Sequence, residues 1–396
     1  MRRIHMPVWL DSAAKPRAMA FVVLFSLEAW CRATLLTIVP LEAHRLMGDA
    51  QSVSVIYFYV SIAGLISTMI IPMLVHVVRR RWAFTFGVVL MVSAVAAYWT
   101  GSLWMFMIGL ACQFIATAIF EIVINLYVLD HVPSTEISKF EPRRLVFVAT
   151  PFTFGPWLGV WLFEHVDPAV TYGFVAVCAL AMLAFFWFLR VSDNPAVTAP
   201  LKPPPNPLRY LPRFFRQPRL VVAWGLAIGR TGWWVMFFVY GPIFLTQSGF
   251  SKDMSALIIS LGVMPLFLAA VWGMVGRKKG IRYLLTLGYG LTAILSIGIA
   301  VAEGSPMIAA AMVIIAAFAA SIIDGAGNTP FLRAVHPHER SEMTSVYVTF
   351  RQTAQLITPG IFAVVLSVFA LPAVFVAGGI GAGAMAVLAR YIPKKL

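Results

Sequence analysis

Charged residues are scarce in this chain of 396 residues and make up only 12% of it. Soluble proteins of ordinary composition carry roughly 25%. This deficit and a mean hydropathy of +0.86 exclude most classes of soluble protein. Hydrophobic residues make up 60% of the chain and gather in long runs, which predicts a membrane protein with many spanning helices.

Cysteine is also scarce, with only Cys31, Cys112 and Cys178, all in apolar segments. Their spacing suggests neither a disulfide framework nor a metal site, so we expect packing residues. The absence of a Walker A motif excludes an ATP-driven pump encoded in this chain. His336 and His338 stand without further ligands, and no catalytic triad can be assembled. We therefore expect no metal, no cofactor and no enzyme.

Acidic residues are few, 16 against 30 basic residues, which gives a formal net charge of +14. A nucleic-acid partner would explain such an excess, but the basic residues cluster in every second loop, for example at 79–81 and 277–279. This alternation marks cytoplasmic loops of membrane proteins. We expect no nucleic-acid partner, an even number of spans and both termini in the cytoplasm. The basic segment 1–17 lacks a cleavage pattern, so the first helix is expected to remain in the protein.

Twelve segments are long and apolar enough to cross a bilayer, which takes about 20 residues. They are 18–40, 53–75, 82–100, 102–130, 145–165, 168–190, 219–244, 254–276, 282–302, 305–328, 343–369 and 371–391. We expect an all-α fold with a six-helix half at 1–190 and a second at 219–396. A Pro-rich basic linker, 191–218, lies between them in the cytoplasm, either solvated or with Tyr210 to Phe215 on the anionic leaflet.

The two halves repeat each other at a nearly constant offset of 202 or 203 residues. The matches are Pro40 with Pro242, Glu28 with Arg230, Glu121 with Asp324, Asn125 with Asn328, Glu136 with Glu339, and Pro156 with Pro359. Such a duplication predicts two parallel six-helix repeats related by an axis along the membrane normal.

One loop carries a recognisable motif between the eighth and ninth spans. Gly273, Lys278, Gly280 and Arg282 match the conserved inner-loop motif of the major facilitator superfamily, while Arg277 replaces its acid. With six plus six spans and a long central segment, the chain resembles that superfamily over its whole length. The resemblance implies transport by alternating access and a central cavity lined by helices 1 and 7.

The equivalent loop between the second and third spans is more degenerate. It keeps the bases Arg80 and Arg81 but has His76 in place of the acid. In the superfamily this acid helps to latch the two halves in the outward-open state. Since it is missing twice, we expect another pair of residues to do its work.

The fifth span carries a short glycine and proline pattern. Gly155, Pro156 and Gly159 resemble the end of the superfamily motif that is enriched in antiporters, which points towards export. The alternative is structural, because two small residues four apart let helices pack closely.

Six charged residues lie inside apolar segments: Glu28, Arg32, Glu121, Arg230, Asp324 and Arg351. A charge at membrane depth costs at least about 2.5–3.5 kcal/mol on insertion scales, so it persists where it is paired or faces a polar cavity. Glu28 and Arg32 are one helical turn apart and share a face. They form either a static ion pair or a proton-coupling site in which Arg32 controls the protonation of Glu28.

An aromatic stripe follows Arg230 in the seventh span. Arg230 and Trp234 are one turn apart and could make a cation–π contact. The candidate substrate-binding residues are therefore Arg32, Arg230, Trp233, Trp234, Phe237 and Tyr240. The alternative is a stripe that only packs. Arg32 and Arg230 would suit an anionic or zwitterionic substrate if the acids do not already occupy them.

The remaining polar residues suggest a cytoplasmic gate. An acid followed four residues later by asparagine occurs in both halves, and Arg351 shares a helix face with Gln355. The gate candidates are Glu121, Asn125, Asp324, Asn328, Arg351 and Gln355. The two acids would pair with Arg351 or the loop bases. The alternative is a static salt bridge at the headgroup level.

These features predict a monomeric secondary transporter in a bacterial inner (plasma) membrane. Its partners are the lipid bilayer, protons and a small-molecule substrate, with no cofactor. Proton-coupled export of a small organic compound by antiport is favoured over proton-linked uptake of an organic anion. A third hypothesis is a transporter-like protein that has lost transport and serves as a sensor or assembly factor, which the doubly missing acid would suit.

Overall fold

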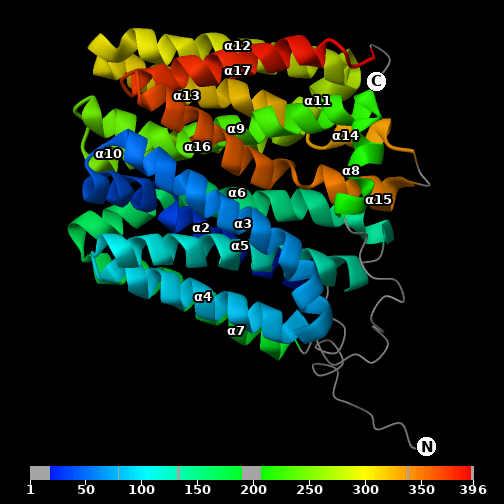
Figure 1. Cartoon of the computed structure of the whole chain (residues 1–396), viewed down its shortest axis with the longest axis horizontal. Coiled ribbons are helices and arrows are strands. Elements are labelled where there is room, and N and C mark those ends of the chain that lie inside the picture. The colour runs from blue at the N-terminus through cyan, green and yellow to red at the C-terminus, as the bar shows by residue number, and fades with distance from the viewer. Residues whose placement is uncertain (1–17, 79, 132–133, 190–206, 337–338, 394–396) are drawn as a thin grey trace, which may run out of the picture. The chain divides into compact units, whose positions relative to one another are not determined.

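The computed structural model describes residues 18–78, 80–131, 134–189, 207–336 and 339–393. The regular elements in these ranges are helices (Figure 1). The first part of the chain forms α2 Ala18–Met47, α3 Ala50–Val78, α4 Arg80–Trp99, α5 Leu103–His131, α6 Ser134–His165 and α7 Pro168–Phe188. The second part forms α8 Pro207–Phe215, α9 Pro218–Gln247, α10 Lys252–Val263, η1 Met264–Leu268, α11 Ala269–Lys279, α12 Ile281–Val301, η2 Ala302–Gly304, α13 Pro306–Asp324, α14 Thr329–Ala334, α15 Arg340–Tyr347, α16 Phe350–Leu366 and α17 Pro372–Ala389.

Within the described ranges, ten helices are long and apolar enough to cross a membrane, or eleven if the bent pair from Lys252 to Lys279 is one span. That pair bends by 50°. Just before the bend the helix tightens into η1, which contains Pro265, and a proline ring removes a helical N–H and crowds the preceding turn. The predicted span 343–369 is divided by a turn at Val348 and Thr349, which leaves α16 with 17 residues. The all-α class is confirmed, while twelve spans and cytoplasmic termini stay predictions.

Tryptophans at the two ends of α4 match the dimensions of a bilayer. Trp82 and Trp99 are 52% and 66% exposed. At a rise of 1.5 Å per residue they are about 25 Å apart along the helix, close to the roughly 30 Å of the hydrocarbon core. Tryptophan prefers the two membrane interfaces, so α4 is a helix of spanning length with an anchor at each end.

The chain divides into two compact units. Unit 1 contains Met1–Leu35 and Ala63–Pro203, and unit 2 contains Leu36–Ile62 and Pro204–Leu396. The segment 36–62 therefore packs with the helices of the second half. Its contacts include a hydrogen bond between the hydroxyls of Ser54 and Tyr240, 2.7 Å apart. The predicted division into halves at 1–190 and 219–396, which follows from the repeat, stays a prediction.

Aromatic stacking and close helix contacts build the core of unit 1. Phe84 of α4 stacks on Phe186 of α7 with ring centroids 4.2 Å apart. Gly155 of α6 lies so close to α2 that a Cβ atom there would be 2.7 Å from the Cβ of Ala33. No larger residue fits that position without movement of a helix, because packed interiors have little free volume.

A short helix, α8, lies inside the predicted linker and belongs to the core of unit 2. Its Phe214 is fully buried against residues of α9, α14 and α15, including Leu220, Phe331 and Met343. This part of the linker is therefore packed rather than solvated.

Candidate functional site

An acid and an arginine meet inside unit 2. Arg230 lies near the middle of α9, and its Nε is 3.7 Å from Oδ1 of Asp324, the last residue of α13. The two side chains are only 15% and 21% exposed. Arg230 also donates through Nη1 to the carbonyl of Gly327 at 3.0 Å and through Nη2 to Oδ1 of Asn328 at 3.4 Å. The guanidinium is thus held by one carboxylate and the turn that follows it.

The turn exists because α13 ends at Asp324. The next four residues, Gly-Ala-Gly-Asn, favour turns over helix. Gly327 has φ of 52°, a conformation that residues with a Cβ rarely adopt. Gly325 meets α11 so closely that a Cβ would lie 2.2 Å from the Cβ of Trp272. The span predicted at 305–328 agrees with the candidate span Pro306–Ala334, but a turn interrupts its helix after Asp324. This break turns backbone and side-chain oxygens towards Arg230.

Trp234 is the second partner of the Asp324 carboxylate. Its indole Nε1 donates to Oδ2 of Asp324 at 2.8 Å. The predicted cation–π contact of Arg230 with Trp234 is replaced by one with Phe350, whose ring centroid is 5.9 Å from the guanidinium. Trp234 therefore acts as a hydrogen-bond donor to the acid.

The rest of the aromatic stripe lies in the packed interior of unit 2. Trp233, Phe237 and Tyr240 are all less than 5% exposed. Trp233 donates to Ser296 at 2.9 Å and stacks on Phe237 with centroids 5.4 Å apart. Their burial favours the packing alternative for these three residues over direct substrate contact.

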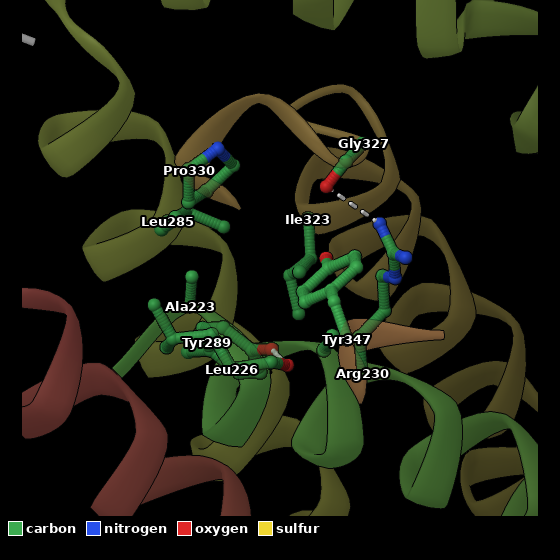
Figure 2. A pocket seen from close by; sticks show the side chains of 10 residues that line it. Ala223, Leu226, Arg230, Leu285, Tyr289, Ile323, Gly327, Pro330 and Tyr347 are labelled. Atoms are coloured by element: carbon green, nitrogen blue, oxygen red, sulfur yellow. Dashed lines mark hydrogen bonds between the residues drawn. The ribbon is translucent and has the colours of Figure 1, made fainter. Parts of the chain in front are cut away.

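A small pocket lies beside Arg230 (Figure 2). Its walls include Leu285, Tyr289, Ile323 and Tyr347, and the Arg230–Gly327 hydrogen bond lies at its edge. Its volume of about 10 Å³ is near the minimum for a single water molecule. The pocket is too small for an organic substrate, but it is large enough for a water molecule next to the ion pair.

Two tyrosines complete the surroundings of Arg230. Tyr347 donates to Oδ1 of Asn328 at 3.2 Å, the same oxygen that Arg230 contacts. Tyr289 donates to the backbone carbonyl of Leu226, one turn before Arg230 on α9. Both hydroxyls therefore fix the frame in which the arginine lies.

Unit 1 contains a second acid–arginine pair on α2. Nη2 of Arg32 is 3.3 Å from Oε2 of Glu28, with side-chain exposures of 33% and 7%. The guanidinium also lies 5.0 Å from the ring centroid of Phe152 on α6. The predicted ion pair is therefore present, and its role in proton coupling stays a prediction.

Two polar atoms, one on α2 and one on α6, are buried with unused hydrogen-bonding capacity. Within the described residues, Nε of Arg32 and Oγ1 of Thr153, the neighbour of Phe152, have no hydrogen-bond partner. Buried polar groups normally have a partner in the protein or an ordered water. Thr153 is a candidate site residue that the sequence did not reveal, because a single threonine in an apolar helix forms no pattern.

The gate candidates have different surroundings in the two units. On α5, Asn125 donates to the backbone carbonyl of Glu121 at 2.7 Å within a continuous helix. In unit 2 the matching acid and asparagine lie around Arg230 instead. Arg351 is exposed on α16, 5.8 Å from the ring of Phe350, and Gln355 follows one turn later. The pairing of Asp324 with Arg230 was not foreseen, and the gate stays a prediction.

The two sequence motifs lie at helix contacts and ends. Gly155, Pro156 and Gly159 are buried, and Thr171 of α7 donates to the carbonyl of Gly159 at 3.2 Å. The inner-loop motif ends α11: Gly280, with φ of 91°, separates α11 from α12. Among its other members, Arg277 and Lys278 are exposed, Arg282 is half-buried on α12, and Gly273 would place a Cβ 3.3 Å from the carbonyl of Gly325.

The chain matches the family model of the Major Facilitator Superfamily over residues 21–359. It belongs to the Major Facilitator Superfamily. No curated protein matches it in sequence. A structure of the nucleoside transporter NupG has a TM-score of 0.71 at 14% identity and covers 95% of this chain and 98% of that chain.

Two more solved structures have the same fold. A D-xylose-proton symporter has a TM-score of 0.74 at 13% identity and covers 95% of this chain and 97% of its own. The peptide transporter POT in complex with sulfate has a TM-score of 0.75 at 13% identity, with 98% of each chain covered. At such identities the likeness shows the fold alone. These structures are transporters, and this superfamily member is a multi-pass membrane protein of transporter type, not an enzyme.

Proposed function

We propose that this superfamily member is a secondary active transporter that couples the movement of a small organic compound to protons by alternating access. The observation that carries the proposal is the carboxylate of Asp324, which lies inside the candidate span Pro306–Ala334, is only 21% exposed and contacts the guanidinium of Arg230 and the indole of Trp234. A charged centre at this depth is expensive, and in membrane proteins it marks an ion or substrate pathway.

The chemistry of this pair suits proton coupling. Arg230 and an ionised Asp324 neutralise each other and hold α9 to the end of α13. A proton on Asp324 would leave the buried guanidinium without its counter-charge, which costs several kcal/mol. Protonation therefore favours a conformation in which the two helices separate and Arg230 finds other partners. A state change that prefers the protonated acid is coupled to proton binding by the same free energy.

Glu28 and Arg32 offer the same chemistry in unit 1, and Glu28 remains our first candidate for the proton carrier. Its carboxylate is almost fully buried, while Arg32 is one-third exposed and has a buried Nε without a partner among the described residues. The pair can therefore exchange its internal contact for one with a substrate or water.

The pairing also bears on the substrate. Arg32 and Arg230 are the two arginines that would attract an organic anion, and each already lies beside an acid. At these sites the net charge is close to zero, which favours a neutral or zwitterionic compound. This charge balance argues against uptake of an organic anion, the earlier alternative.

Export by antiport is the direction that the glycine and proline motif of α6, with Gly155, Pro156 and Gly159, favours. Close packing of Gly155 against Ala33 accounts for that glycine without any reference to direction. Proton-linked uptake is therefore the second candidate, and the likeness in fold to the D-xylose-proton symporter supports it. We further propose that the protein is a monomer in a bacterial inner membrane and that Glu121 and Arg351 contribute to a cytoplasmic gate.

The experiment has two stages. First, a panel of metabolites and drugs is screened for thermal stabilisation of the purified protein, because a ligand stabilises the state that it binds. Each hit is then added to proteoliposomes under an imposed proton gradient while internal pH is recorded. Antiport moves protons against the substrate, and symport moves them with it. Absence of flux for every stabilising compound, together with a co-purifying protein, would support the sensor or assembly hypothesis instead.

A further inference from the structure

The helix α8 is anchored to unit 2 by one aromatic residue and one ion pair. Phe214 is fully buried, and the guanidinium of Arg213 forms an ion pair with Glu339, while its Nη1 is 3.8 Å from Glu342. Gln217 donates to the other oxygen of Glu339 at 3.0 Å. The helix thus packs against α15, and the labels of the two helices stand next to each other in Figure 1.

The outward side of the helix is basic. Arg209, in the first turn of α8, and Arg216, which directly follows its last residue, are seven residues apart, about two helical turns, and form a basic stripe beside Arg213. Arg209 and Arg216, and Arg219 in the first turn of α9, are exposed and have no ion pair with any described residue. Since Glu339 and Glu342 already contact Arg213, the exposed surface carries uncompensated positive charge.

An apolar side chain lies next to this stripe at the start of a span. Phe215 is 48% exposed and meets Trp224 of α9 edge-on, with ring centroids 5.6 Å apart. The span α9 begins at Pro218, only three residues after α8 ends. A helix with a basic face and exposed aromatic surface at the end of a span has the features of an interfacial helix.

We propose that α8, with Arg219, binds the head groups of anionic phospholipids. The phosphodiester groups complement Arg209, Arg216 and Arg219, and the exposed edge of Phe215 contacts the adjoining glycerol and acyl region. A soluble phosphate would complement the charges but would leave Phe215 in water. The lipid site uses the exposed arginines, so it leaves the buried Phe214 and the packing of α8 on α15 in place.

The test measures binding of phosphatidylglycerol to the full-length protein in detergent by native mass spectrometry. The variant carries Arg209→Gln, Arg216→Gln and Arg219→Gln. A charge-matched control carries Arg277→Gln, Lys278→Gln and Lys279→Gln at the exposed end of α11. Each basic residue near an anionic surface is expected to contribute roughly fivefold to binding. We expect the α8 variant to lose at least about tenfold in apparent affinity and the control to lose clearly less.

Three comparisons decide the outcome. A variant with lysine at positions 209, 216 and 219 should keep most of the binding, because it keeps the charge. Phosphatidylcholine and glycerol 3-phosphate should bind weakly to the wild-type protein. Equal losses in the α8 variant and the control, or no loss in the α8 variant, would overturn the proposal. If glycerol 3-phosphate bound as tightly as phosphatidylglycerol, this would overturn the lipid assignment in favour of a phosphate site.

Discussion

The Nε of Arg230 lies 3.7 Å from the Oδ1 of Asp324, which joins the middle of α9 to the last residue of α13. The chain reaches this contact because α13 ends early and its following turn bends towards Arg230. The same carboxylate accepts a hydrogen bond from Trp234 at 2.8 Å. One acid therefore holds two residues of α9, and we propose that its charge decides whether the helices stay together.

Neutralising both members of this pair should cost less than the two single changes added together. Asp324→Asn or Arg230→Gln leaves a buried charge without its partner, and we expect each to lower the unfolding free energy by about 3 kcal/mol. The double variant should lose clearly less than the sum of the two. Unfolding in mixed detergent measures the cycle, and strictly additive losses would show that the two charges do not interact.

Trp234 should matter for coupling, while its neighbour should matter only for packing. Trp234→Phe keeps an aromatic ring but removes the donor to Asp324, so we expect a changed pH profile of transport and a stability loss of about 1–2 kcal/mol. Trp233→Phe removes a buried hydrogen bond to Ser296 and is the matched control. It should lower stability by a similar amount and leave the pH profile unchanged. Identical pH profiles for both variants would contradict the role of Trp234.

Gly155 should be required for the contact between α2 and α6. Gly155→Ala would place a Cβ 2.7 Å from that of Ala33, and overpacking of this kind costs about 1–3 kcal/mol. Gly173→Ala on α7 is the control, because nothing lies within 4 Å of its Cβ position. The control should stay within about 1 kcal/mol of the wild type. Thermal unfolding of both variants checks this, and an equally stable Gly155→Ala protein would refute the packing interpretation.

The hydrogen bond between Ser54 and Tyr240 should stabilise unit 2. Both side chains are fully buried, and the two oxygens are 2.7 Å apart. We expect Tyr240→Phe and Ser54→Ala to interact by about 0.5–1.5 kcal/mol in a double-mutant cycle. The comparison pair combines Ser54→Ala with Tyr57→Phe, at another buried tyrosine of α3. A coupling no larger than that of the comparison pair would show that this bond does not hold α3 to α9.

The helices were predictable because long apolar runs in the sequence indicate membrane-spanning helices. The sixth predicted span, 168–190, compares with α7 at Pro168–Phe188, where Asp167 caps the first turn and proline follows. The first span was predicted to end at residue 40, but its helix continues to Met47 and contains Pro40. Hydropathy alone did not reveal the turn at Val348 and Thr349, because neither residue breaks a helix by itself.

The partner of Asp324 was harder to foresee. The Gly-Ala-Gly-Asn stretch after it is a turn signal, and recognising it would have ended the helix early. Asp324 then lies inside the span rather than at its end, because α14 still separates it from the next loop. The choice of Arg230 rather than Arg351 depends on how α9 and α13 pack, which no local pattern encodes. Phe214 was missed for the same reason, since its burial depends on α15.

Proton coupling is tested most directly by comparing uphill accumulation with equilibrium exchange of the same substrate in proteoliposomes. The proteins to compare are the wild type, Asp324→Asn and Glu28→Gln. Exchange shows that a variant is folded and can still alternate, while accumulation requires coupling. We predict that at least one variant keeps exchange and loses proton-driven accumulation. If both variants accumulate substrate as the wild type does, with unchanged pH dependence, neither acid carries the proton.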